Sequence, residues 1–299
     1  MKLLLVSAIF VFYGSLARSQ GCSDAGLCTI NTLRPSNTVS GTVARNQFRI
    51  GASAGSADHD ITVFGSSLEY GRQISESFSM DTRVTFLTQT GNNITTSGVG
   101  DLYLHGNYTA SKKTMLILGI KIPFNKGNKN KGGLPLPMDY QSSLGTVDLL
   151  AAFSHSVGKW KFHMGYQQPL TQNANAFFAE NYPLHSPLST FQSTNGYIRK
   201  GDILIRVSYF IRLSERLSLT PGILPIYHLG NDEFNNLNGR QVINGSEGLT
   251  LNVNGYINYE INKRHALEMS IGSPLVVRDV RPDGLTRGFV VTMQYQLSF

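Results

Sequence analysis

Long runs of alternating apolar and polar residues recur through this chain of 299 residues. In the last run, from Phe289 to Phe299, every second residue is apolar. A period of two indicates β-strands whose two faces meet different surroundings. Strands of globular proteins cluster near five or six residues, whereas a tilted strand needs about nine to eleven to cross a bilayer. Most of these runs reach ten residues or more, which favours membrane-spanning strands.

Twelve such strands are predicted, and no segment with a helical period competes with them. Their approximate bounds are residues 47–54, 61–74, 78–90, 100–110, 114–123, 141–155, 159–170, 198–213, 216–229, 248–261, 265–274 and 287–299. Thirty glycines and an aromatic content of 10% agree with β structure. The fold class is therefore expected to be all-β.

The connections alternate in length along the chain. Short turns are expected at 75–77, 111–113, 156–158, 214–215 and 262–264, and longer loops at 55–60, 91–99, 124–140, 171–197, 230–247 and 275–286. An up-and-down transmembrane barrel has short periplasmic turns and long extracellular loops, and an even number of strands places both chain ends on the periplasmic side. Residues 47–299 are thus predicted to form an antiparallel transmembrane β-barrel of about twelve strands.

Alternation alone does not say which face of the sheet is outside. A soluble lipocalin-like barrel or a sandwich alternates in the same way, with its apolar side inward. Aromatic residues here lie near both ends of the expected strands, as in the two aromatic girdles of a membrane barrel. Together with strand length and loop rhythm, they favour the membrane.

The N-terminus predicts export. Lys2 precedes an apolar run from Leu3 to Leu16, and small or polar residues follow up to Gln20, so residues 1–20 are expected to be a cleaved signal peptide. No later stretch is long and apolar enough for a transmembrane helix. The net charge of +7 is modest and scattered, so no nucleic-acid partner is expected.

Residues 21–46 form a separate N-terminal segment rich in Ser, Thr, Asn and Gly. Its two cysteines, Cys22 and Cys28, are expected to form a disulfide in an oxidising compartment. The alternative is lipidation of Cys22, which Gln20 fits poorly because a small residue is expected there. The segment either folds into the barrel as a plug or lies in the periplasm, and the expected disulfide favours the plug.

If the apolar set of side chains faces lipid, the other set faces the lumen. The ionisable residues expected to line the pore are Arg49, Glu69, Asp81, Arg83, Asp101, His105, Asp148, Lys161, His163, Arg206, Arg212, Glu260 and Glu268. Both signs are present, which predicts a paired and partly wetted interior. Twelve strands lie between the filled interior of about eight and the aqueous channel of about sixteen, so a narrow pore is expected.

One loop and one strand carry further signals. The loop at 124–140 carries three lysines, Lys126, Lys129 and Lys131, and no phosphate-loop motif surrounds them. The lysines could contact anionic lipopolysaccharide or anionic solutes, or the loop could be an ordinary solvated one. Pro221 and Pro225 each remove a ladder donor from a strand, which predicts a bulge or kink.

Catalytic signals are weak. Ser193-Thr194-Asn195-Gly196 resembles the motif of membrane-barrel phospholipases, but Phe191 stands where their His is expected. Asp58, His59 and Asp60 have the residue types of membrane-barrel proteases, yet they are adjacent in one loop. No spacing suggests a metal or a cofactor, and the chain is not expected to be an enzyme.

One stretch resembles a known family. It consists of Gly98-Val99-Gly100-Asp101-Leu102-Tyr103-Leu104, then Asn107-Tyr108, then Leu118-Gly119-Ile120-Lys121-Ile122-Pro123. This pattern is similar to that of the outer-membrane family named for the meta-pathway of phenol degradation. The chain departs from that pattern at Asn107 and at Phe124-Asn125. The resemblance implies kinship with the long-chain fatty-acid channels, a plug from the N-terminal segment, and uptake of small molecules, hydrophobic ones included. The Cys22–Cys28 segment also resembles the start of mature barrels from Bacteroidetes-type bacteria.

The chain ends in a motif of its own. Tyr295, Leu297 and Phe299 resemble the C-terminal signal that the barrel-assembly machinery reads in Gram-negative bacteria. The expected location is therefore the outer membrane, among its lipid and lipopolysaccharide. The predicted function is a porin-like channel for passive transport of small molecules through a narrow, partly plugged lumen. Two alternatives remain open, namely a non-transporting barrel whose outer loops bind a partner and an outer-membrane hydrolase.

Overall fold

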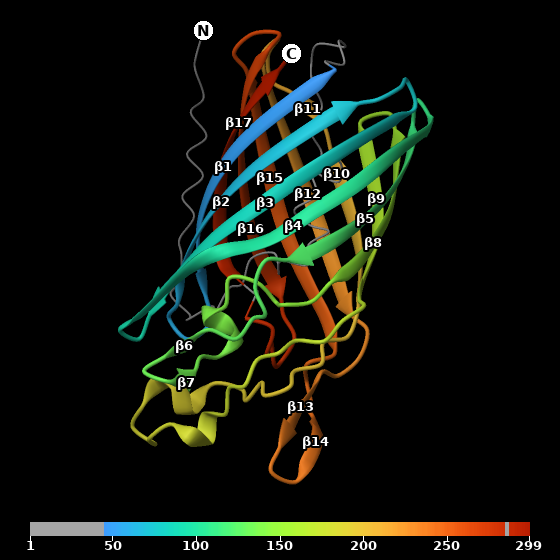
Figure 1. The fold of residues 1–299 in the computed structure, drawn as a ribbon. Helices are drawn as coiled ribbons and strands as arrows, with labels where there is room; N and C mark the ends of the chain where they lie inside the picture. The colour runs from blue at the N-terminus through green and yellow to red at the C-terminus, as the bar shows by residue number, and fades with distance from the viewer. Residues whose placement is uncertain (1–44, 285–286) are drawn as a thin grey trace, which may run out of the picture.

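The computed structural model describes residues 45–284 and 287–299, which form a closed antiparallel β-barrel (Figure 1). Its twelve strands in the described residues are β1 (Asn46–Ala57), β2 (Thr62–Gln73), β3 (Phe78–Gly91), β4 (Ile94–Ser111), β5 (Thr114–Pro123), β8 (Asp148–Val157), β9 (Trp160–Pro169), β10 (Asp202–Tyr209) continued by β11 (Ile211–Arg212), β12 (Leu217–His228), β15 (Gly248–Glu260), β16 (His265–Val276) and β17 (Arg287–Ser298). Each strand pairs with the next along the chain. The prediction of a twelve-stranded barrel is confirmed.

The remaining described elements are short and lie in the loops. They are β6 (Asn130–Lys131), β7 (Leu134–Pro135), β13 (Glu233–Asn236), β14 (Gly239–Val242) and the 3-10 helices η2 (Met138–Tyr140), η3 (Ala179–Asn181) and η4 (Pro187–Thr190). Within the described part of the chain, every helix is too short or too polar to cross a membrane. Figure 1 shows the long loops gathered at one end of the barrel, the loop end, and the C-terminus at the other, the turn end.

The barrel closes where β1 meets β17. Their register runs from Gln47 opposite Ser298 to Ala57 opposite Arg287, with one irregularity near Gly55. At the turn end, Asn46 and Phe299 exchange two backbone hydrogen bonds of 2.9 Å each. The last strand therefore completes the ring against the first, as its alternation predicts.

The outer face of the barrel is apolar and the inner face is polar. On β1, Ile50 is 50% exposed while Arg49 is 5% exposed. On β2, Leu68 is 51% exposed while Glu69 is 2% exposed. This arrangement is the reverse of a soluble lipocalin-like barrel and matches a barrel whose outer band meets lipid. The soluble alternative is thereby excluded.

One predicted loop is wrong, because β3 and β4 continue through residues 91–99 to a two-residue turn. Asn92 and Asn93 have φ of 52° and 59°, the left-handed values that such hairpin turns require and that Asn tolerates. Threonine and serine hydroxyls pair across the two strands, with Thr88 Oγ1 2.9 Å from Ser97 Oγ. The paired hairpin thus projects beyond the point where β5 ends.

Two other boundaries also differ from prediction. Strand β8 begins at Asp148, not at residue 141, because Gln141 binds the β3–β4 hairpin and does not continue the ladder. Gln89 Nε2, for example, donates to the Gln141 carbonyl oxygen at 2.7 Å. Strand β1 runs on to Ala57, which shortens the expected loop at 55–60.

The projecting part of β4 has an edge that β5 does not pair, and the loop at 124–147 covers it. Asn125 Nδ2 donates to the Val99 carbonyl at 2.8 Å, and Lys129 Nζ donates to the Ser97 carbonyl at 2.8 Å. Lys131 Nζ donates to the Asn93 carbonyl at 2.8 Å. Such cover protects an edge from pairing with another chain. These two lysines therefore bind the protein itself, and their contact with lipopolysaccharide stays a prediction.

The two strand prolines interrupt one side of β12. Its pairing with β15 is continuous, but its pairing with β10 omits Ile205 and Arg206, opposite Pro225 and its neighbour. A second break falls at Phe210, near Pro221, and separates β10 from β11. Proline has no N–H to donate to a ladder. The predicted irregularity is confirmed, and it lies in the seam between β10 and β12.

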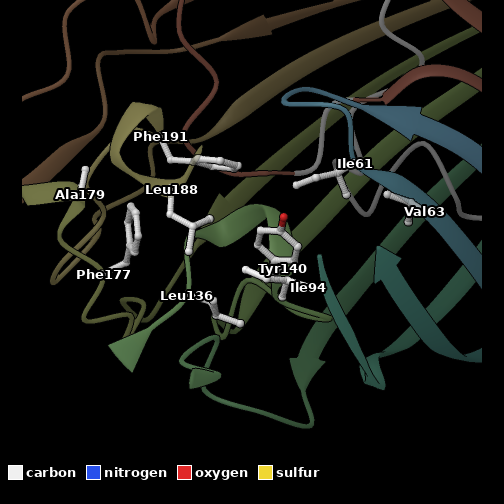
Figure 2. Packing of buried hydrophobic residues seen from close by; sticks show 9 residues of the cluster. All are labelled: Ile61, Val63, Ile94, Leu136, Tyr140, Phe177, Ala179, Leu188 and Phe191. Atoms are coloured by element: carbon white, nitrogen blue, oxygen red, sulfur yellow. The ribbon is translucent and has the colours of Figure 1, made fainter. Parts of the chain in front are cut away.

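The loops pack on a core of their own, which Figure 2 shows. The buried residues of this cluster are Ile61, Val63, Ile94, Leu136, Tyr140, Phe177, Ala179, Leu188 and Phe191. Tyr140 also donates its hydroxyl to the Gly91 carbonyl at 2.9 Å. We call residues 124–147, 170–201, 229–247 and 277–284 together the loop layer. Because its parts bury apolar side chains against one another, the layer is a folded body and not a set of separate loops.

Candidate functional site

All thirteen residues predicted to line the pore lie on barrel strands. Nine are buried, namely Arg49, Glu69, Asp81, Arg83, Asp101, His105, Asp148, His163 and Arg206. Lys161, Glu260 and Glu268 are half-buried, and Arg212 is exposed near the turn end. The buried ones alternate with exposed apolar residues, so they lie on the inner face. Their role in conduction stays a prediction.

Several of the inner charges are paired across neighbouring strands. Arg49 donates to Glu69 at 2.6 Å. Lys121 Nζ lies 2.8 Å from Asp148 Oδ2, and Asn107 Nδ2 donates to Asp81 at 2.6 Å. Buried charges need such partners. The sequence-based site omitted Lys121, although it lies two residues after Gly119 and four after Ile117 on β5, which places it on the same inner face.

Toward the turn end, the inner face of β9 and β10 carries Lys161, His163 and Arg206. Arg206 stands opposite His163 in the register, and Ser208 stands opposite Lys161. The guanidinium of Arg206 lies over the ring of Tyr256, 5.8 Å from its centroid. Among the described residues, no carboxylate pairs with Lys161, and neither ring nitrogen of His163 has a hydrogen-bond partner.

Beside these residues lies an apolar patch, which the sequence-based prediction of a polar lumen did not include. Its buried members come from β4, β5, β8, β10 and β12, and they are Tyr103, Ile117, Leu150, Leu204, Leu224 and Ile226. Leu150 stands opposite Gln167 of β9, and Leu204 stands opposite Gly165 of β9, so the patch continues on both sides of that strand. The inner surface is therefore amphipathic, with charge and apolar area side by side.

At the loop end, a buried charge network joins two strands to three loops. His228 contacts Asp202 at 2.6 Å through Nδ1 and Asp232 at 2.8 Å through Nε2. Arg199 pairs with Asp202, and its Nε lies 3.7 Å from Asp283 Oδ2. Arg278 and Tyr197 complete the network. Arg278 donates to Asp283 at 3.0 Å, and the Tyr197 hydroxyl donates to Asp232 at 2.8 Å.

The network fixes the ionisation of its members. Burial alone raises the pKa of Asp283, but the guanidiniums of Arg278 and Arg199 outweigh it and hold that pKa below its ordinary value. No pattern in the sequence predicts this cluster, since its residues come from loops far apart along the chain. It ties the loop layer to the rim of the barrel.

An open pocket of about 1000 Å³ lies between the loop layer and the turn that joins β1 to β2. Asp139 lines it, together with Asp58, Asp60 and Arg281. Burial, and then the neighbouring carboxylates of Asp58 and Asp283, raise the pKa of Asp139 from 3.8 to about 7. Arg281 and a backbone hydrogen bond oppose this shift.

Asp139→Asn is expected to change how the stability of the loop layer depends on pH. Folded protein keeps the Asp139 proton up to a pH of about 7, whereas an unfolded loop loses it near 3.8, so the wild-type layer loses stability as pH rises between these values. The variant should lack that loss and be more protected than wild type at pH 8. Hydrogen-exchange protection factors around η2 at pH 5 and pH 8 measure it. Asp60→Asn, on an exposed residue of the same pocket, is the control, and equal behaviour of the two variants would contradict the assignment.

The residues considered for catalysis have structural partners. Ser193 Oγ donates to Glu180 at 2.9 Å and accepts from the Ala179 N–H at 2.9 Å. Asp58 pairs with Arg281 at 2.8 Å. His59 stacks on Phe191 with ring centroids 3.9 Å apart. The described residues thus give Ser193 a carboxylate neighbour and no histidine in hydrogen-bond contact.

The remaining predicted features lie at the two chain ends. Residues 1–20, the plug segment and the Cys22–Cys28 disulfide lie outside the described residues, apart from residues 45 and 46. Tyr295 and Leu297 pair with Ile50 and Phe48 in the closing ladder. Phe299 is 57% exposed at the turn end. Recognition of these last residues by the assembly machinery stays a prediction.

Comparison with known proteins supports the fold. Neither a protein-family model nor a curated protein matches the sequence. Among solved structures, an outer membrane channel from Pseudomonas putida F1 is 16% identical, with a TM-score of 0.58 over 89% of this chain and 99% of that chain. The translocator domain of the autotransporter NalP from Neisseria meningitidis is 12% identical, with a TM-score of 0.48 over 92% and 94%. The CymD monoaromatic hydrocarbon channel is 8% identical, with a TM-score of 0.46 over 93% and 94%. The first similarity shows an outer-membrane barrel fold, and membership of the phenol meta-pathway family stays a prediction.

Proposed function

We propose that this protein is an outer-membrane channel through which small molecules diffuse passively. The observation that carries the proposal is the closed barrel of the described residues, whose outer band is apolar and whose inner face holds charged side chains. A barrel inserted in lipid needs such an exterior, and a polar interior suits solutes in water. Its fold similarity to an outer membrane channel supports the same conclusion. In this orientation, the turn end faces the periplasm and the loop end faces the outside of a Gram-negative cell.

The lumen is narrow in this proposal, and the N-terminal segment partly fills it. Long side chains such as Arg83, His105 and Arg206 project inward in a barrel of intermediate strand number. Residue 45 leads into β1 at the turn end, which is the periplasmic mouth in this proposal. The apolar patch at Leu150 and Leu204 favours solutes with some hydrophobic surface, which agrees with the family resemblance.

Conductance in planar bilayers tests the channel. The protein should give discrete current steps, and deletion of residues 21–44 should enlarge them because it removes the plug. A variant in which a Gly/Ser chain of equal length replaces residues 21–44 separates filling of the lumen from loss of a tether. Folded protein that gives no current in any of the three forms would contradict the proposal.

A second candidate is a barrel whose outer loops bind a partner. The observation in its favour is the loop layer, which is folded and presents Leu184 and Leu237 almost fully exposed, at 97% and 99%. Isolated exposed leucines are common on protein surfaces, so this support is weaker. Absence of current together with a folded loop layer would favour this second function.

A further inference from the structure

We propose that the open pocket between the loop layer and the β1–β2 turn binds a small organic cation. The ligand is an amine whose ammonium group lies among the pocket carboxylates and whose apolar body packs on His59 and Val280. This site lies at the loop end, and it does not depend on the proposed channel function.

The pocket has room for such a ligand and its walls are accessible. Its volume is about 1000 Å³, and pockets that hold small molecules usually measure about 300–1,000 Å³. Of its lining residues, His59, Asp60 and Asp279 are exposed, and Asp139 and Val280 are half-buried. A ligand can therefore reach these side chains without displacing others.

The turn that joins β1 to β2 holds one wall of the pocket in place. His59 and Asp60 have φ of 55° and 57°, left-handed values that His and Asp adopt more often than most residues do. The Ala57 N–H donates to the Ile61 carbonyl at 2.7 Å, and Asn92 Nδ2 donates to the His59 carbonyl at 3.0 Å. The turn is thus fixed to the β3–β4 hairpin before any ligand arrives.

The charges around the pocket do not balance. Of the described lining residues, Asp58, Asp60, Asp139 and Asp279 carry carboxylates, and Arg281 carries a permanent positive charge. Arg281 already pairs with Asp58, with 2.8 Å between its Nη2 and Oδ2 of that residue. In the described part of the chain, the carboxylates of Asp60 and Asp279 have no ion pair. A ligand with a positive charge would compensate this excess, whereas an anion would increase it.

Asp139 experiences this excess of negative charge most directly. Burial, and then the carboxylates of Asp58 and Asp283, raise its pKa to about 7, although Arg281 and a backbone hydrogen bond oppose the shift. A cation beside Asp139 would stabilise its ionised form. The half-buried position of this carboxylate also limits screening by water and salt.

An organic cation fits the pocket better than a metal ion does. Among the described residues, no three His, Cys, Asp or Glu side chains are placed to hold a metal ion together. The pocket has instead an aromatic surface, because the ring of His59 stacks on Phe191 with centroids 3.9 Å apart and 23° between the planes. Phe191 belongs to the core of the loop layer (Figure 2), which supports the ring of His59 from behind. The apolar body of an amine can pack on such a surface.

Calorimetric titration of the full chain in detergent tests the site, with benzylamine as the probe and benzyl alcohol as its uncharged analogue. At pH 8, above the pKa of Asp139, benzylamine should bind and benzyl alcohol should bind more weakly. Asp139→Asn and Asp279→Asn should each weaken benzylamine binding about tenfold, since a hydrogen bond to a charged group is lost. Glu215→Gln removes an exposed carboxylate at the turn end and should leave the affinity unchanged.

The heat-dependent migration of each variant in gels shows first that it is folded. No binding of benzylamine, or equal binding of benzylamine and benzyl alcohol, would overturn the inference. Wild-type affinity in both aspartate variants would place the cation elsewhere and overturn it as well. A loss in Glu215→Gln as large as in Asp139→Asn would show attraction to the overall charge of the protein, which would also contradict a site in this pocket.

Discussion

Arg199→Ala is expected to detach the loop layer from the barrel while the barrel itself stays folded. The substitution leaves the buried carboxylates of Asp202 and Asp283 without one of their cations. Removing one partner of a buried ion pair costs about 3–5 kcal/mol, because the other charge remains buried. Limited proteolysis should therefore cut within residues 170–201 and 277–284 much faster than in wild type, with an unchanged β spectrum by circular dichroism.

Arg240→Ala is the matched control. Arg240 is also a loop arginine with a carboxylate partner, but its side chain is 58% exposed and lies 3.5 Å from Glu233. Exposed pairs contribute little to stability, so this variant should be cut at the wild-type rate. If Arg199→Ala resists protease as well as Arg240→Ala does, the charge network does not hold the loops.

Leu118→Arg is expected to prevent or strongly weaken insertion of the barrel into lipid. Leu118 is 63% exposed near the middle of β5, in the outer apolar band. An arginine at the midplane of a bilayer on the outside of a barrel costs about 2–4 kcal/mol. Urea unfolding in lipid vesicles should show the loss of stability, and the folded fraction in gels should fall.

Leu237→Arg makes the same change where no lipid is expected. Leu237 is 99% exposed between β13 and β14. This variant should unfold at the wild-type urea concentration. Equal stability of the two arginine variants would mean that the apolar band does not face the bilayer, and would remove the basis of the channel function.

The strands were predictable because each carries its own signal. A run such as 287–299 alternates strictly, and its period depends on no distant residue. The end of the β3–β4 hairpin was missed although its turn is also local. This part of the hairpin lacks the usual alternation with apolar residues, because it projects beyond the apolar band. Its outward positions carry hydroxyl side chains, namely those of Thr88, Thr90, Thr95 and Ser97. The Asn92-Asn93 pair was the available signal for the turn.

The candidate site was predictable only in part. Alternation places Arg49 or His163 on the inner face, but the partner of each depends on the strand register, which composition does not reveal. Leu150 and Leu204 lie at strand positions that point into the lumen. From the sequence alone, however, an apolar residue on a membrane strand is interpreted as facing lipid. The loop-end network could not be predicted at all, since Arg199, His228 and Asp283 meet only after three loops have folded.

The barrel is weakest at the seam between β10 and β12, and this is not the place where the two ends of the chain pair. The chain joins its ends through the nearly continuous ladder of β1 and β17, whereas Pro221 and Pro225 interrupt a pairing between strands that are neighbours in sequence. Under force or heat, we therefore expect the pairing between β10 and β12 to break before the pairing between β1 and β17. The barrel would then open between β10 and β12, while β1 and β17 would still be paired.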